Sequence, residues 1–170
     1  ICLSACDSDT ENSTTESEET SSENMEAAFT FKAQPDQNKV EIQVGGEVFT
    51  NYSYPNDIAK PILYPLTTVS GKRLTRGFPI DPQSGERTDH PHHVGYWFNY
   101  GNVNGLDFWN NSEAIKEEDK DGYGSIRHQE VVEMDDANGR MIVKANWTSP
   151  NEETLIEETT TFVFSQEGTT

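Results

Sequence analysis

The run SIRHQEVVEMDDANGRMIVKANW, residues 125–147, decides the fold class. Its two halves, 125–134 and 140–147, read as strands, and Asp136-Ala137-Asn138-Gly139 between them is a typical hairpin turn. A third strand-like run, 155–164, follows after another short turn. Consecutive strands joined by short turns pair antiparallel, so this part of the chain predicts an antiparallel sheet.

A period of two also marks residues 29–54. Apolar side chains alternate with polar ones in 29–33 and again in 40–44, which predicts two half-buried strands. Gly45-Gly46 is a tight-turn signal, so residues 48–54 are expected to return as the partner strand. The sequence shows no long amphipathic helix and no internal repeat. We therefore predict an all-β fold, most simply an antiparallel β-sandwich.

The middle of the chain has a different composition. Residues 54–93 are rich in Pro and Gly, and proline removes ladder donors, so a long, well-tied loop with brief extended pieces is expected there. Long loops of this kind often carry function. Strand character resumes at 94–100 and at 103–109, whereas the charged segment 113–121 predicts an exposed loop or a single helical turn.

Charge and hydropathy narrow the possible partners. The 170 residues carry a formal net charge of -18, and residues 1–26 hold eight of the 30 carboxylates with no Lys or Arg. The remainder is still acidic, with 22 carboxylates against 12 basic residues, and such a surface repels phosphate backbones. No nucleic-acid partner is therefore expected. No apolar run approaches the roughly 18 residues that a membrane-spanning helix needs.

The first residues predict a lipid anchor. Leu3-Ser4-Ala5-Cys6 resembles the lipobox of bacterial lipoproteins, in which small residues precede an acylated cysteine. Residues 1–6 would then be the end of a signal peptide, and the acidic Ser/Thr/Glu run 7–26 a disordered tether. We expect attachment to the lipid bilayer of a bacterial cell envelope through Cys6, at the outer membrane, on its periplasmic face or at the cell surface. A chance Leu-Ser-Ala-Cys in a cytosolic protein is the alternative.

The rest of the chain, residues 27–170, is expected to be one β-rich domain. The sequence has no initiating Met and stops directly after a strand-like run. We therefore expect a part of a longer protein, with the β-rich domain cut at its C-terminal end. Both cysteines lie in the first six residues, so no disulfide framework is predicted for that domain.

A polar cluster in the central loop is the candidate site. Three of the four histidines, His90, His92 and His93, fall within four residues, and imidazole is both a common acid or base and a common metal ligand. Asp89 could hold a neighbouring imidazole in one tautomer. His128, from a later strand, could complete a set of ligands for copper or zinc.

Three interpretations of this cluster remain open from the residues alone: a structural role, catalysis or ligand binding without metal, and metal binding. His92 and His93 are adjacent, and in an extended chain they would point to opposite faces, so the three rings need not converge. Arg76 and Arg87 could bind a carboxylate, or they could pair with Glu86 and Asp89, which we expect.

Aromatic residues surround the cluster in sequence. Most of them should lie in the core, but an exposed Trp97 or Trp109 would be a typical floor for a sugar ring. Alternation should turn Trp97 away from its two neighbours in the chain. Asn104 and Asp107 add the amide and carboxylate groups that hydroxyls prefer.

Four segments together resemble the bacterial proteins labelled "PmoA family" or "methane oxygenase PmoA". The segments are 60–66 (KPILYPL), 75–79 (TRGFP), 86–93 (ERTDHPHH) and 102–109 (NVNGLDFW). The resemblance implies exported proteins of polysaccharide-degrading bacteria and a supersandwich similar to the galactose mutarotase-like proteins. The methane monooxygenase subunit of that name has several membrane-spanning helices, for which this sequence has no suitable run.

The expected function is that of a carbohydrate-active or carbohydrate-binding lipoprotein. One of His90, His92 or His93 would be the acid or base, oriented by Asp89, and Arg76 could bind an acidic sugar group. The candidate sugar-binding residues are Trp97, Trp109, Asn104, Asp107 and Arg87. One alternative is a copper or zinc enzyme that uses His90, His92, His93 and His128, and another is a non-catalytic binding or scaffold protein.

Overall fold

The computed structural model describes residues 29–68 and 70–166. The predicted lipobox and acidic tether lie outside these residues. The regular secondary structure of the described chain is antiparallel β-sheet apart from two short 3₁₀-helices, η1 (Pro35–Gln37) and η2 (Glu117–Gly122). The η2 turn lies in the segment for which an exposed loop or helical turn was predicted. No helix in this part of the chain is long and apolar enough to cross a membrane.

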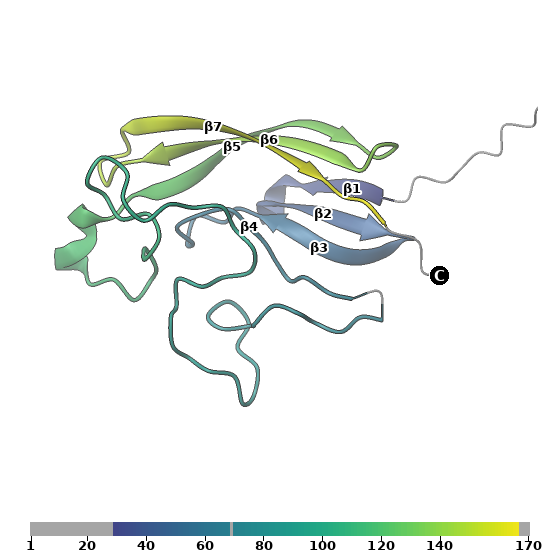
Figure 1. Cartoon of the computed structure of the whole chain (residues 1–170), viewed down its shortest axis with the longest axis horizontal. Helices are drawn as coiled ribbons and strands as arrows, with labels where there is room; N and C mark the ends of the chain where they lie inside the picture. The colour runs from purple at the N-terminus through teal and green to yellow at the C-terminus, as the bar shows by residue number, and fades with distance from the viewer. Residues whose placement is uncertain (1–28, 69, 167–170) are drawn as a thin grey trace, which may run out of the picture.

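Two sheets form the two layers seen in Figure 1. Each sheet follows chain order without a crossover, because every strand returns beside the one before it through a short connection or a loop. The first sheet contains β1 (Phe29–Gln34), β2 (Lys39–Val44), β3 (Glu47–Ser53) and β4 (Ile62–Leu63), and the second contains β5 (Ser125–Asp135), β6 (Arg140–Thr148) and β7 (Thr154–Val163). The prediction of an antiparallel all-β fold with the layers of a β-sandwich is confirmed.

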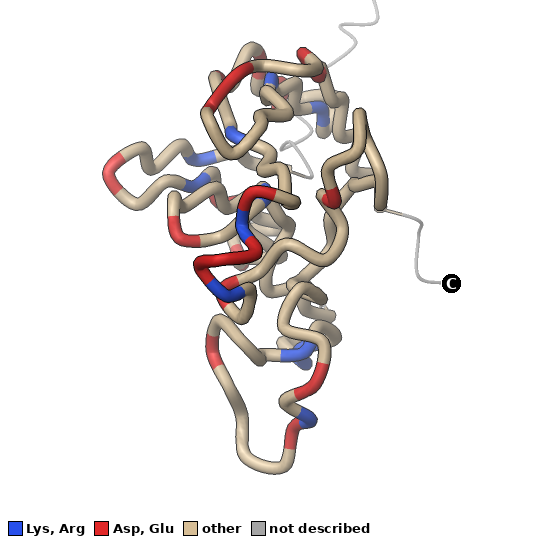
Figure 2. Tube along the Cα trace, turned by 90° about the vertical axis from the view of Figure 1, so that its left-hand side faces the viewer, with Lys and Arg blue, Asp and Glu red and all other residues tan. Residues whose placement is uncertain are grey.

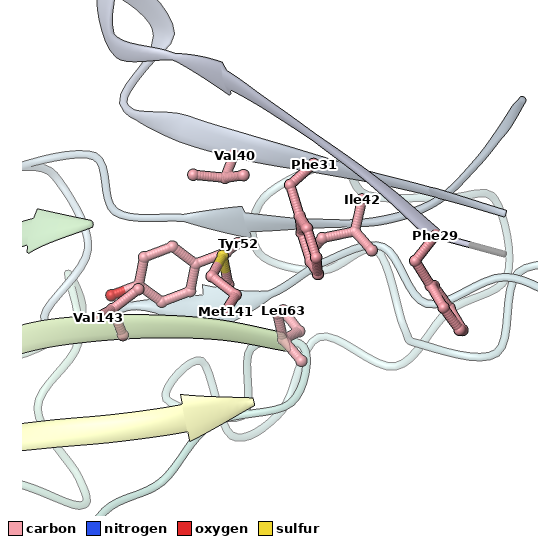
Figure 3. Packing of buried hydrophobic residues seen from close by; sticks show 8 residues of the cluster. All are labelled: Phe29, Phe31, Val40, Ile42, Tyr52, Leu63, Met141 and Val143. Atoms are coloured by element: carbon pink, nitrogen blue, oxygen red, sulfur yellow. The ribbon is translucent and has the colours of Figure 1, made fainter. Parts of the chain in front are cut away.

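The main core lies between the two sheets. Met141 and Val143 of β6 pack against apolar side chains of β1 to β4, and both are almost completely buried (Figure 3). Their partners are Phe29, Phe31, Val40, Ile42, Tyr52 and Leu63. In β1, β2 and β6 the period of two therefore has a direct cause: alternate residues of these strands face the opposite sheet.

Two smaller cores fasten the long central loop to the sheets. Phe108 packs with Trp147 of β6, and Gly124 is needed beside it because a Cβ there would lie 2.1 Å from the Phe108 ring. On the other side, Tyr64 and Val94 pack around Ile62 of β4. The loop is thus held at both ends, and its middle extends away from the sheets (Figure 1).

The strands predicted at 94–100 and 103–109 are wrong. The first segment forms a single bridge, between Tyr96 and Leu63, because β4 has only two residues to pair with. The second turns back on itself at Asn104-Gly105, where Val103 bridges Leu106.

Side-chain alternation nevertheless persists in the first segment. Tyr96 and Phe98 are 61% and 69% exposed, whereas Trp97 between them is half-buried. Tyr64 is buried as expected, but the exposure of Tyr96, Phe98 and Trp109 contradicts the expectation that most of these aromatic side chains lie in the core.

Candidate functional site

The three clustered histidines lie on one turn. The backbone N–H of His93 donates to the carbonyl of His90 at 3.0 Å, and His90 has a φ of 49°. The ring centroids are 5.1 Å apart for His90 and His93, which are stacked, and 4.3 Å apart for His92 and His93. The extended-chain argument that separated His92 from His93 fails here because the backbone turns. All three rings converge, and we call this segment, residues 90–93, the histidine turn.

Arg76 holds the histidine turn in place. Its guanidinium donates to the carbonyls of Arg87 (3.4 Å), His90 (2.9 Å) and His93 (3.3 Å) and to the carboxylate of Asp89 (3.2 Å). A planar guanidinium has five donors in a rigid fork and can join several acceptors at once. Arg76 is therefore occupied by the loop itself, as the pairing interpretation expected.

Asp89 is shared among three partners. Besides Arg76, its carboxylate accepts from Arg87 at 2.6 Å and lies 3.1 Å from Nδ1 of His90. Partial burial raises the pKa of Asp89, but the hydrogen bond from His90 and the charge of Arg87 outweigh it and lower the pKa below its ordinary value. The ionised carboxylate of Asp89 accepts a hydrogen bond from Nδ1–H of His90, so Nε2 is the acceptor of that ring in its neutral form.

Glu86 forms no ion pair with Arg76 or Arg87, contrary to expectation. Its carboxylate accepts hydrogen bonds from the backbone N–H groups of Gly77, Phe78 and Gln83 at 2.8 to 3.0 Å. These backbone bonds lower the pKa of Glu86. Glu86 thus ties two parts of the loop together.

Figure 2 shows acidic and basic positions interspersed along the trace, and the ion pairs of this loop join residues close in the sequence.

Two indoles stand beside the histidine turn. Trp97 and Trp109 meet edge to face with ring centroids 4.5 Å apart. The ring of His93 lies 6.2 Å from Trp109, perpendicular to it, and 6.5 Å from Trp97. Trp109 is 40% exposed, so part of an indole beside His93 is open to solvent.

Lys60 connects the two indoles, and the sequence reasoning did not single it out. Its Nζ donates to the carbonyl of Trp109 at 2.9 Å and lies 4.2 Å from the centre of the Trp97 ring. The residue is only 2% exposed. Burial lowers the pKa of Lys60 to about 8, although the charge of Asp107 acts in the opposite direction. One signal in the sequence could have identified Lys60: it is a basic residue next to the apolar run 61–64, and a charged group buried with such a run needs a polar or aromatic partner.

His92 and His93 are both biased toward the neutral form. Burial lowers the pKa of His92, and the charges of His93 and Lys60 add to this effect. Burial also lowers the pKa of His93, with contributions from His90 and Arg76. Neutral imidazoles can accept a proton, so at neutral pH His92 and His93 offer bases rather than fixed positive charges.

The histidine turn separates two hollows. On one side is an open cleft of about 640 Å³, into which His90 and His93 face together with Arg76, Arg87 and Asp89. On the other side, His92 faces a smaller pocket of about 270 Å³, whose lining also includes Lys60, Tyr64, Asn111 and Glu113. A ligand could thus reach the cluster from two sides.

Other predicted residues are used differently. Asn104 has a φ of 52° at a tight turn, a conformation that Asn tolerates well, and it is exposed. Asp107 accepts two hydrogen bonds from Asn110, while its charge still acts on Lys60 and His92.

His128 lies apart from the histidine turn. Its ring stacks on Tyr54 at 3.9 Å, and its Nδ1 is 3.1 Å from the hydroxyl of Tyr52. Residues 29–68 and 70–166 contain no group of three or more His, Cys, Asp or Glu side chains placed to hold a metal ion. The alternative copper or zinc set with His128 as a ligand does not come together in the described residues, because β5 carries this ring to the two tyrosines.

Comparison with known proteins identifies a family but no activity. Neither the curated proteins nor the solved structures contain a match to this chain. Residues 39–170 match the model of a family of unknown function, DUF6807. This range spans the two sheets from β2 onward, the central loop and the histidine turn. The chain therefore belongs to the DUF6807 family of unknown function.

Proposed function

We propose that the protein is a lipoprotein of the bacterial cell envelope that binds carbohydrate at the histidine turn and acts on it by proton transfer. The observation that carries this proposal is the partly exposed Trp109 ring beside His93, with Trp97 and Lys60 packed behind it. An indole with one open face suits the apolar face of a sugar ring, and polar groups at its edge suit the hydroxyls.

The electrostatics of the turn support proton transfer. His92 and His93 are neutral near pH 7, so either can take a proton from a hydroxyl or from water and later return it to the product. His90 is oriented by Asp89. The N–H donors of Arg76 are hydrogen-bonded to carbonyls of the loop, so we assign it the role of positioning the histidines rather than holding an acidic sugar group.

Two features of the sequence support the cellular setting. Leu3-Ser4-Ala5-Cys6 resembles a lipobox, and the segments around the histidine turn resemble exported proteins labelled "PmoA family" from polysaccharide-degrading bacteria. Acylation of Cys6 would place the domain at the membrane surface, where extracellular glycans are processed.

The test compares a His92→Ala/His93→Ala double variant with wild type on a panel of plant and microbial oligosaccharides, with product analysis by mass spectrometry. Turnover should fall at least about 100-fold, the usual contribution of a positioned acid or base. Trp109→Ala should raise KM more than it lowers kcat. His128→Gln, which changes a histidine outside the turn, is the control and should retain activity. Equal turnover in the double variant, with an unchanged melting temperature, would refute the role of the histidine turn.

A further inference from the structure

A third hollow lies on the other side of the 96–98 segment from the histidine turn. It is a groove of about 470 Å³ between this segment and β7, lined by Tyr96, Phe98, Tyr52, Glu158, Thr160 and Phe162 among others. Alternation separates it from the histidine turn: Trp97 contacts His93, whereas Tyr96 and Phe98 stand out with most of their surface exposed. None of the histidines lines this groove.

One wall of the groove is aromatic. Tyr96 is held by its bridge to Leu63 through two backbone hydrogen bonds, of 2.8 and 3.0 Å. Phe98 meets the buried Trp147 edge to face, with ring centroids 6.1 Å apart. Both rings are thus positioned by the fold while most of their surface stays open. Ordered aromatic faces of this kind cost little conformational entropy when a ligand covers them.

The other wall carries hydrogen-bonding groups. Glu158 and Thr160 of β7 are half-buried, and the carboxylate of Glu158 accepts from the indole N–H of Trp147 at 2.6 Å and from the hydroxyl of Thr160 at 2.5 Å. A carboxylate has about four acceptor sites, so two of them remain for a ligand. The oxygen positions are fixed by these two bonds, which makes Glu158 a preorganised acceptor.

Tyr52 adds a neutral phenol to the lining of the groove. Its hydroxyl lies 3.1 Å from Nδ1 of His128, and its ring is buried. Burial, together with the charge of Glu158, raises the pKa of Tyr52 far above its ordinary value. Among the described residues that line the groove, none is Lys, Arg or His, and Glu158 has the only formal charge. An anionic ligand therefore has no counter-charge here.

We propose that this groove is a second binding site, which takes a neutral oligosaccharide. Two open aromatic faces match the C–H faces of successive pyranose rings, and the acceptor oxygens of Glu158 match their hydroxyl donors. The inference goes beyond the proposed activity of the histidine turn and does not depend on it, because no histidine lines this groove, and Ile62 is the one lining residue that it has in common with the two hollows beside the histidine turn.

Four neutral trisaccharides test this site: cellotriose, xylotriose, mannotriose and maltotriose, each titrated into the full chain by isothermal calorimetry. At least one should bind. Phe98→Ala and Glu158→Gln should each weaken that binding at least tenfold. Tyr100→Ala, which removes an exposed aromatic ring of the same segment outside the groove, should have no effect. Trigalacturonate, which is anionic, should bind more weakly than the neutral sugars.

Three outcomes would overturn the proposal. The first is that none of the four trisaccharides binds. The second is that Phe98→Ala and Glu158→Gln both bind the trisaccharide with the affinity of the wild type. The third is a dimer in light scattering that Phe98→Ala dissociates, which would make the groove an interface between two copies. Melting temperatures check that the variants fold, and Tyr96→Ala replaces Phe98→Ala if loss of the Trp147 contact proves destabilising. Failure here with intact turnover at the histidine turn would leave the proposed function standing.

Discussion

At the scale of single residues, Lys60 shows how one buried charge organises the candidate site. Its ammonium group joins the carbonyl of Trp109 to the face of Trp97, so the two indoles depend on one side chain. Burying an ammonium group costs free energy, and one hydrogen bond and one aromatic face offset only part of that cost. The lowered pKa of Lys60 is the expression of this imbalance.

Lys60 predicts a specific pH dependence of stability. Its pKa is about 8 in the folded protein and near 10.5 ordinarily, so between these values the folded state binds fewer protons than the unfolded state. Stability from this group must then rise with pH across that window, by up to about 3 kcal/mol. Lys60→Met should lack the rise. The measurement is urea unfolding of both proteins from pH 7 to pH 10.5.

The comparison depends on the difference between the two curves, because the other titrating groups are common to both proteins and cancel. Lys60→Arg provides a second reference, since a guanidinium keeps its charge over the whole range. If the free energies of unfolding of wild type and Lys60→Met change in parallel over this pH range, the claim that burial lowers the pKa of Lys60 is refuted.

At the scale of elements, the histidine turn depends on a residue far from it in sequence. The guanidinium of Arg76 binds three carbonyls and one carboxylate of the segment 87–93. These four hydrogen bonds hold the segment in its turned conformation around the Arg76 side chain. Local turn chemistry contributes one backbone hydrogen bond, between His93 and His90. The convergence of the three imidazoles is therefore a property of the tied loop.

Arg76→Lys should loosen the turn while leaving the sheets intact. A single ammonium group cannot reach four acceptors at once, so the backbone amides of 87–93 should exchange at least about tenfold faster with solvent deuterium. Exchange in β5 to β7 should not change. The measurement is hydrogen–deuterium exchange followed by mass spectrometry.

Arg87→Lys is the matched control for this experiment. The side chain of Arg87 is 83% exposed and, among the described residues, bonds only to Asp89, so its replacement should leave exchange in the turn unchanged. The clamp role of Arg76 is wrong if both variants exchange at the wild-type rate.

At the scale of the whole molecule, the two sheets are held together by the side chains that β6 presents to the first sheet. Met141 is completely buried among Phe29, Phe31, Ile42 and their neighbours (Figure 3). A polar link reinforces this contact: Asp136, at the hairpin between β5 and β6, accepts from the backbone N–H of Phe31 at 3.0 Å. The interior of the sandwich, rather than any surface ion pair, sets its stability.

Met141→Ala should destabilise the protein by about 2–5 kcal/mol, because it removes buried methylene and thioether groups and leaves a cavity between the sheets. Met134→Ala, at a 41% exposed position of the neighbouring strand, is the control and should cost less than about 1 kcal/mol. Urea denaturation with linear extrapolation measures both. Equal losses in the two variants would contradict the assignment of Met141 to the interface between the sheets.

The strands of the sandwich could be predicted from the sequence because their signals are local. Alternation in 29–33 and 40–44, the Gly45-Gly46 turn and the hairpin turn 136–139 each depend on residues close in the chain. The predictions for 94–100 and 103–109 failed for the opposite reason. An extended segment becomes a strand only beside a partner edge, and β4 offers two residues.

For this protein the sequence alone determined the all-β class, the hairpin order and the presence of a histidine-rich loop, since each follows from side-chain periodicity, turn chemistry or composition. Only the tertiary structure decided how the loop is arranged. It brought Arg76 to the carbonyls of the histidine turn, Lys60 beneath the indoles, and His128 to Tyr52 and Tyr54. These contacts join residues 14 to 76 positions apart, and such distances are set by the packing of the sheets and loop, which no local pattern encodes.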